Sequence, residues 1–422
     1  MILDHPLNEE QRLKAQRNFS RFNLLNGASY MCLGETVVVL LAIKLDSPDR
    51  VLVFISAMMY LGYLLLPFGV MRTGRVGAAR SQADFWVLRN VSALIVASSS
   101  IVYLVRPPLS WLTLLFGCFL FYGCRAAGLV MAQPLIGDFT TDDDRARFLG
   151  TTNSYFYAAS VFSLVTVSLV LRRFDSMWAL TGIIVAGSCL GVFASSFVRQ
   201  IDESNEIRDS ARKPMLHQLK TILGDSVLRR QIYAGVVFNL ANIFTYSMTV
   251  SAVKRAYGFS DTRALVMSAA QFAAAVVGSK LTSRVADRYG AKNLMIVGYL
   301  LVFPLCLFWL LVPTGLSGSG LTSLVFLFPF INLGLFGAFL NNAPVVYFLK
   351  SVPKERQVAG ILLINFVTGC GASLLGMLLA AGLVSFAEHM YGSGMPMYRA
   401  YFAGSSVILL GGLVFFKRLK RV

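Results

Sequence analysis

The sequence predicts an all-α polytopic membrane protein with twelve transmembrane helices in two pseudo-symmetric six-helix bundles. Of its 422 residues, 56% are hydrophobic and only 14% are charged. A soluble chain of this length needs more charge to cover its surface. Apolar runs recur along the whole chain, each long enough to cross ~30 Å of hydrocarbon. A stretch of the first half is also repeated in the second.

The apolar runs place the spans and the domain boundaries. We expect a first bundle at 1–198, a cytoplasmic linker at 199–230 and a second bundle at 231–422. The twelve predicted spans are 22–45, 51–71, 84–105, 108–137, 150–171, 176–198, 231–253, 262–283, 292–313, 321–349, 357–386 and 398–416.

The net charge of +17 has an uneven distribution over the loops. Lys and Arg on the side that holds both termini and the linker outnumber those on the other side by about three to one. The positive-inside rule therefore predicts cytoplasmic termini. We expect the protein to lie in the inner (plasma) membrane of a bacterium. The basic excess favours contact with anionic membrane lipid and not with nucleic acid. We expect a monomer.

Several classes of function are disfavoured by what the spans contain. No ATP-binding P-loop pattern is present. The six cysteines lie inside spans without metal-ligand spacing, and the three histidines lie outside them. A membrane-embedded enzyme would need a cluster of nucleophile, base or metal ligands, and none is visible. We therefore expect no metal, no cofactor and no enzymatic activity.

A repeat relates the two halves. The stretch FNLLNGASY begins at residue 22, and FNLANIFTY begins at residue 238. Further along, Pro134 and Gly150 match Pro344 and Gly360, and the offset between the two halves is nearly the same as for the first match. Each Pro–Gly pair encloses a short charged turn. Such repeats are typical of transporter folds, in which the solute site lies near the midplane between the halves.

One loop carries a family signature. The sequence SRVADRYGAKN, which begins at Ser283, resembles the loop motif G-x-L-A-D-R-x-G-R-R of the major facilitator superfamily. Asp287, Arg288 and Gly290 match this motif, and Ser283 replaces its first glycine. The resemblance implies a twelve-helix secondary transporter. It also implies that these residues form a conformational latch, in which the charges hold helix ends together in one state.

The corresponding loop of the first half departs from the motif. GVMRTGRVGAAR keeps Arg75 and Gly77, which we assign to the latch, but it has Gly74 where the motif has its acid. The switch is therefore expected to rely on Asp287. In span four, RAAG from Arg125 resembles the arginine-bearing fourth helix of the family.

Two charges lie near the middle of predicted spans, Glu35 in span one and Arg125 in span four. A charge at the bilayer centre costs roughly 2.5–3.5 kcal/mol on insertion scales, which makes both residues functional candidates. We predict that they couple transport to protons, with Arg125 as partner of Glu35 or as a clamp for an anionic solute group. A fixed ion pair between them is the alternative. Arg89 and Lys280 are expected to extend to the interface as structural residues.

Uncharged polar residues follow helical spacing on several spans. They suit a solute with several hydrogen-bonding groups; the alternative is hydrogen bonding between helices, worth about 0.6 kcal/mol each. The substrate-binding candidates are Asn26, Tyr30, Asn153, Tyr157, Asn242, Tyr246, Gln271, Asn332, Asn341 and Asn365.

These patterns predict a secondary active transporter that moves a small organic solute by alternating access, with proton coupling through Glu35. Span five lacks the glycine-proline pattern that many drug and proton antiporters of the superfamily carry, so the resemblance favours uptake by symport over export. The alternative function is a flippase for lipids or lysolipids, or a solute sensor that does not transport, on the same scaffold.

Overall fold

The computed structural model describes residues 2–47, 51, 55, 58, 61–174, 176–212, 224–259, 261–313, 324–392 and 394–419. Within these ranges, nine helical segments are long and apolar enough to cross a membrane. Two further helices, α12 (Ser226–Ser251) and α13 (Asp261–Tyr289), cover the predicted spans 231–253 and 262–283. The predicted span 51–71 lies partly outside the described residues. The all-α membrane class is therefore confirmed, and the count of twelve stays a prediction.

The chain divides into two compact units. Unit 1 comprises Met1–Phe148, Tyr155–Ile222 and Val352–Phe366, and unit 2 comprises Leu149–Ser154, Leu223–Ser351 and Val367–Val422. Each unit is described by itself.

Unit 1 holds nearly all helices of the first half and one from the second. Its elements are β1 (Ile2–Leu3), α1 (Glu9–Leu33), α2 (Glu35–Lys44), η1 (Gly62–Leu65), α4 (Leu66–Val76), α5 (Ala78–Val105), α6 (Pro107–Leu129), α7 (Ala132–Phe139), most of α8 (Arg145–Arg173), α9 (Met177–Arg199), β2 (Glu203–Ser204), α10 (Asn205–Arg212) and α17 (Lys354–Asn365).

Unit 2 holds the other helices of the second half. Its elements are α12, η2 (Ala252–Ala256), α13, α14 (Ala291–Leu300), α15 (Val302–Leu311), α16 (Leu327–Ser351), η4 (Phe366–Gly371), which begins at the last residue of unit 1, α18 (Ala372–Tyr391) and α19 (Met395–Lys417). Among these, α16 packs on α13 and α14, and α19 packs on α12, α15 and α18.

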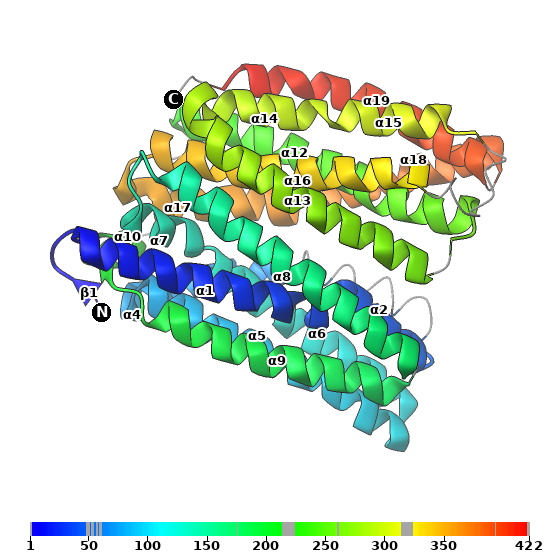
Figure 1. The fold of residues 1–422 in the computed structure, drawn as a ribbon, viewed down its shortest axis with the longest axis horizontal. Coiled ribbons are helices and arrows are strands. Elements are labelled where there is room, and N and C mark those ends of the chain that lie inside the picture. Colours follow the sequence, from blue (N-terminus) through cyan, green and yellow to red (C-terminus); the bar gives the residue numbers. More distant parts are fainter. Residues whose placement is uncertain are drawn as a thin grey trace. The chain divides into compact units, whose positions relative to one another are not determined.

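The core of unit 1 forms where α5 packs against α6 and α9, and α1 packs along α9 (Figure 1). Small residues allow these helices to approach closely. A Cβ on Gly27 of α1 would lie 2.2 Å from the carbonyl oxygen of Phe156, and one on Gly187 of α9 would lie 2.4 Å from Cys32 Cβ. The glycines of these helices therefore set the distance between backbones.

The predicted span 22–45 is two helices. Helix α1 ends at Leu33, Gly34 has an extended backbone with φ −67° and ψ 162°, and α2 begins at Glu35. The helix restarts when the amides of Val37 and Val38 donate to the carbonyl oxygen of Gly34. The polar segment before the break and Glu35 after it thus belong to different helices.

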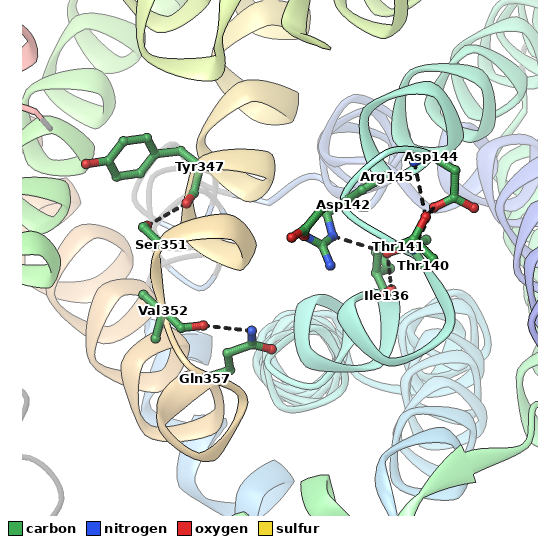
Figure 2. A network of polar contacts seen from close by, with 10 residues as sticks. All are labelled: Ile136, Thr140, Thr141, Asp142, Asp144, Arg145, Tyr347, Ser351, Val352 and Gln357. Carbon is green, nitrogen blue, oxygen red and sulfur yellow. Dashed lines mark hydrogen bonds and ion pairs between the residues drawn. The ribbon is translucent and has the colours of Figure 1, made fainter. Parts of the chain in front are cut away.

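The turn between α7 and α8 is a compact polar network in unit 1 (Figure 2). The carboxylate of Asp144 accepts hydrogen bonds from the amide and the hydroxyl of Thr141, at 2.7 and 3.0 Å. Arg145 pairs with Asp142 at 2.5 Å and donates from Nε to the hydroxyl of Thr140 at 3.2 Å. Asp142, Asp144 and Arg145 are therefore engaged within the turn, and Asp144 also accepts a hydrogen bond from Gln16 of α1 at 2.7 Å.

Candidate functional site

Arg125 lies on α6 inside unit 1 and is partly exposed. Its guanidinium carbon lies 5.5 Å from the centre of the Tyr30 ring, and Tyr63 and Tyr122 are close enough to act on its charge. No acidic residue in the described part of the chain forms an ion pair with it. Arg125 is thus a guanidinium held by aromatic rings.

Arg89 lies on α5 and is 0% exposed, so the prediction that it extends to the membrane interface is wrong. Its guanidinium donates to Asn26 Oδ1 at 3.1 Å and to Ser29 Oγ at 3.4 Å. It also lies over the Trp86 ring, 5.0 Å from the centroid. The hydrogen bonds from α1 and the Trp86 ring of α5 stabilise the Arg89 side chain in the interior. They replace part of the hydration that the guanidinium loses on burial.

The guanidinium groups of Arg89 and Arg125 lie close enough to repel each other. Like charges in a medium of low dielectric constant are costly, and an anion close to both would lower that cost. The side chain of Glu35 lies outside what the structure describes, so its pairing with Arg125 stays a prediction. The described residues alone make this region electropositive.

A cavity in unit 1 adjoins this region but is too small for a solute. Its volume is about 10 Å³, and its walls are mostly apolar, with Phe121, Tyr122 and Val96 among them. Such a volume admits about one water molecule.

Asn26 joins α1 to α5 in this arrangement. Its amide oxygen accepts both the Arg89 bond and one from Trp86 Nε1 at 3.0 Å, and the residue is 8% exposed. These contacts fit the alternative to substrate binding, in which a polar side chain forms hydrogen bonds between helices. The sequence did not indicate that Trp86 and Arg89, one helical turn apart on α5, would share it.

In unit 2, two candidates lack such partners. Asn332 of α16 is 6% exposed, and neither its amide oxygen nor that of Gln271 of α13 accepts a hydrogen bond from a described residue. The helices touch closely here, since a Cβ on Gly334 would lie 2.1 Å from the backbone oxygen of Gln271. Buried amides without partners are costly, and a solute could satisfy them.

The other candidates are dispersed. Asn153 donates to Asn342 Oδ1 at 2.5 Å within unit 2, a contact between helices. Tyr157 is partly buried with its ring against Phe156. Asn365 is partly buried at the last position of α17. The remaining candidates are exposed, namely Asn242, Tyr246 and Asn341.

The predicted latch residues lie at two similar turns. Gly77 joins α4 to α5 with φ 91°, and Gly290 joins α13 to α14 with φ 83°, a region that side chains rarely adopt. Arg75 is exposed at the end of α4, and Arg288 is exposed with its guanidinium carbon 5.3 Å from the centre of the Tyr289 ring. The side chain of Asp287 lies outside the described residues.

Sequence reasoning also missed Glu203, which the structure places directly at the first of these turns. Its carboxylate accepts hydrogen bonds from the amides of Ala78 and Ala79, the first residues of α5. The sequence signal for it was weak, because Glu203 is one acid among several in a polar segment.

The chain resembles solved transporter structures over nearly its whole length. The proton:xylose symporter XylE shares 14% identity, with 98% of this chain and 97% of that chain covered and a TM-score of 0.69. A bacterial homologue of the iron transporter ferroportin in its outward-facing state shares 12%, covering 96% and 99%, with a TM-score of 0.71. The E. coli fucose:proton symporter FucP shares 12%, covering 95% and 98%, with a TM-score of 0.66.

Identities this low show a common fold alone, and a search of curated proteins finds no match. The family model of the Major Facilitator Superfamily matches residues 23–332 and 232–422, which together include nearly the whole chain. Members of this family and the solved neighbours are membrane transporters and not enzymes. The chain therefore belongs to the Major Facilitator Superfamily.

Proposed function

We propose that this protein is a secondary active transporter for a small organic solute that carries an anionic group. The observation that supports the proposal is Arg125, a partly exposed guanidinium in unit 1 without an ion pair to any described acid. Arg89 adds a second positive charge close by. A guanidinium binds carboxylate or phosphate through parallel hydrogen bonds, so Arg125 is suited to receive that group.

Within unit 2, the amide oxygens of Gln271 and Asn332 are proposed as separate acceptors for a polar solute, because no described residue donates to them. Of the predicted substrate-binding residues, Tyr30 remains in the proposal because its ring faces the Arg125 guanidinium. We also propose transport by alternating access in the direction of uptake, as the sequence predicts. A polar solute is compatible with the solved structures of similar fold, which include sugar:proton symporters and the nucleoside transporter NupG.

Proton coupling through Glu35 is part of the proposal. Glu35 begins α2 directly after the break at Gly34, in the same unit as Arg125. Solute uptake into proteoliposomes is expected to depend on an inward proton gradient, and Glu35→Gln is expected to remove that dependence while binding persists. Uptake that stays gradient-dependent in Glu35→Gln would exclude this role.

The placement in the membrane is proposed from the charge distribution. Both termini are assigned to the cytoplasm of a bacterium, with repeats at 1–198 and 231–422, a linker at 199–230, and a monomeric protein. Single cysteines introduced at the termini are expected to react with impermeant maleimide only after the cells are opened. Labelling of intact cells would reverse the topology.

The test of the solute class is a thermal-shift screen of the purified protein against organic carboxylates, phosphate esters, neutral sugars, nucleosides and lysolipids. Anionic solutes are expected to raise Tm, and Arg125→Gln is expected to weaken their binding about 10- to 100-fold, as for the loss of a charge-assisted hydrogen bond. Arg173→Gln, which alters an exposed arginine at the end of α8, is the control.

Two outcomes would contradict the proposal. If neutral solutes raise Tm by the same amount in the wild type and in Arg125→Gln, the proposed binding of an anionic group by Arg125 is excluded. Stabilisation by lysolipids alone, without uptake of any soluble solute, would favour the flippase.

A further inference from the structure

The segment that follows α9 turns back onto unit 1 and is not a free linker. Its strand β2 pairs in parallel with β1, with Ile2 opposite Glu203 and Leu3 opposite Ser204. Glu203 is 2% exposed and Ser204 is 3% exposed. The pairing with β1 and the packing on α7 and α10 therefore bury these two residues.

The carboxylate of Glu203 caps α5. Its two oxygens accept hydrogen bonds from the amides of Ala78 at 2.7 Å and Ala79 at 3.2 Å. These amides have no partner within the helix, and the helix dipole favours a negative charge at this end. Gly77 leaves room for the carboxylate, because a Cβ there would lie 2.2 Å from its Oε1.

Two further contacts fix the same segment. Ser204 donates from its amide and its hydroxyl to the carboxylate of Asp138 on α7, each at 2.6 Å. Arg212 of α10 donates from Nε to the carbonyl oxygen of Gly74 at 2.7 Å, and a Cβ on Gly74 would lie 3.3 Å from Arg212 Cγ. Gly74 occupies the position of the acid in the loop motif, so α10 packs over the place where that acid is missing.

The docked segment contacts helices from both predicted bundles. Helix α10 packs against α4 and against α17 within unit 1 (Figure 1). Helix α17 belongs by sequence to the second predicted bundle. A segment that touches both helices is placed to hold them together while it is docked.

We propose that Glu203 is the acid of a proton-linked latch, supplied by the segment after α9 in place of the acid that the loop between α4 and α5 lacks. Docking of residues 201–212 on α4, α5 and α7 closes the latch, and their release opens it. The proposal does not depend on the identity of the solute.

The titration of Glu203 supports the proton linkage. Burial raises the pKa of Glu203 to about 7, and the negative charge of Asp138 on α7 adds to this increase. The two amide hydrogen bonds from α5 and the N-terminal ammonium act in the opposite direction. Of the nearby basic residues, Arg75 on α4 and Arg80 on α5 are exposed, and Arg212 on α10 is bonded to the Gly74 carbonyl.

The sign of the linkage follows from these values. When the segment is released, Glu203 meets water and its pKa returns toward 4.5, the ordinary value for glutamate. Docking therefore takes up a proton between pH 4.5 and 7. Docking is strongest at acidic pH and weakens by up to about tenfold per pH unit as the pH rises through this interval.

Hydrogen–deuterium exchange on the full-length protein in nanodiscs tests the latch. The amides of residues 78–79 and 203–212 are measured between pH 5 and 8 and corrected for intrinsic exchange. In the wild type, protection is expected to fall as pH rises. Glu203→Gln, which keeps one acceptor oxygen without the charge, is expected to give protection that no longer varies with pH. Glu203→Ala is expected to exchange at least about fivefold faster at every pH, through local opening.

Matched variants distinguish release of the docked segment from a general loss of structure. Glu206→Gln changes an exposed acid on α10 and is expected to keep the wild-type profile. Gly77→Ala displaces the carboxylate by a different route and is expected to reproduce Glu203→Ala. The proposal is overturned if Glu203→Gln keeps the wild-type pH slope, or if Glu203→Ala keeps the protection while helix content and elution volume are unchanged.

Discussion

In unit 1 the amide oxygen of Asn26 accepts hydrogen bonds from Trp86 and Arg89, whereas in unit 2 that of Asn332 accepts none from the described residues. Both asparagines are more than nine-tenths buried. The same residue type thus serves the scaffold in one unit and remains unsatisfied in the other. Burial alone does not separate the two roles, and the hydrogen-bond partners do.

A second difference concerns charge. In unit 1 the guanidinium groups of Arg89 and Arg125 lie close together, whereas the unsatisfied candidates of unit 2, Gln271 and Asn332, are amides. We infer that unit 1 offers positive charge and that unit 2 offers hydrogen-bond acceptors. The variants below would sharpen or break this division, in order of decreasing effect.

The largest effect on stability is expected from Arg89→Ala. It leaves a cavity, removes a bond to Asn26 and one to Ser29, and exposes the face of Trp86. The free energy of unfolding is expected to fall by about 2–4 kcal/mol, because the cavity and the lost hydrogen bonds outweigh the relief of repulsion from Arg125. Unfolding in mixed micelles measures it, with Arg173→Ala as control. A loss below that of the control would show that Arg89 is not part of the scaffold.

Asn26→Leu and Asn332→Leu form a matched pair. Asn26→Leu leaves two donors without an acceptor and is expected to lower the free energy of unfolding by about 2 kcal/mol. Asn332→Leu removes an unsatisfied amide and is expected to leave stability unchanged or raise it by up to about 1 kcal/mol. Solute binding is expected to weaken about tenfold in Asn332→Leu, through the loss of a hydrogen bond to a polar solute.

Two quantities are measured for both variants: the free energy of unfolding, and the affinity for the solute that the thermal-shift screen identifies. Equal destabilisation by the two substitutions would erase the difference between the units. A fully retained affinity in Asn332→Leu would remove Asn332 from the solute site.

The smallest effect is expected from Trp86→Phe. It removes one of the two hydrogen bonds to Asn26 and keeps an aromatic ring under Arg89. The free energy of unfolding is expected to fall by about 1 kcal/mol, mostly from the lost hydrogen bond. Trp86→Leu serves as the comparison, since it also removes the cation–π contact. If the two variants were equally stable, the ring would not support the guanidinium.

Much of the architecture could be predicted because membrane burial acts on each segment separately. Apolar length predicts a helix wherever backbone groups must bond within their own segment. The loop motif also pointed to Gly77 and Gly290, and both lie at tight turns directly before a helix, because such a turn is local. The break at Gly34 could not be predicted from the presence of a glycine, because α1 continues without a break through Gly27.

The sequence by itself determined the all-α membrane class and the family, since hydropathy and short motifs are properties of contiguous residues. Tertiary structure decided which polar groups are satisfied, because that depends on partners far apart in the chain. It turned Arg89 inward onto Asn26, and it brought Glu203 to the start of α5. A polar group in an apolar interior is costly until a partner reaches it, and only the packing of helices brings that partner within reach.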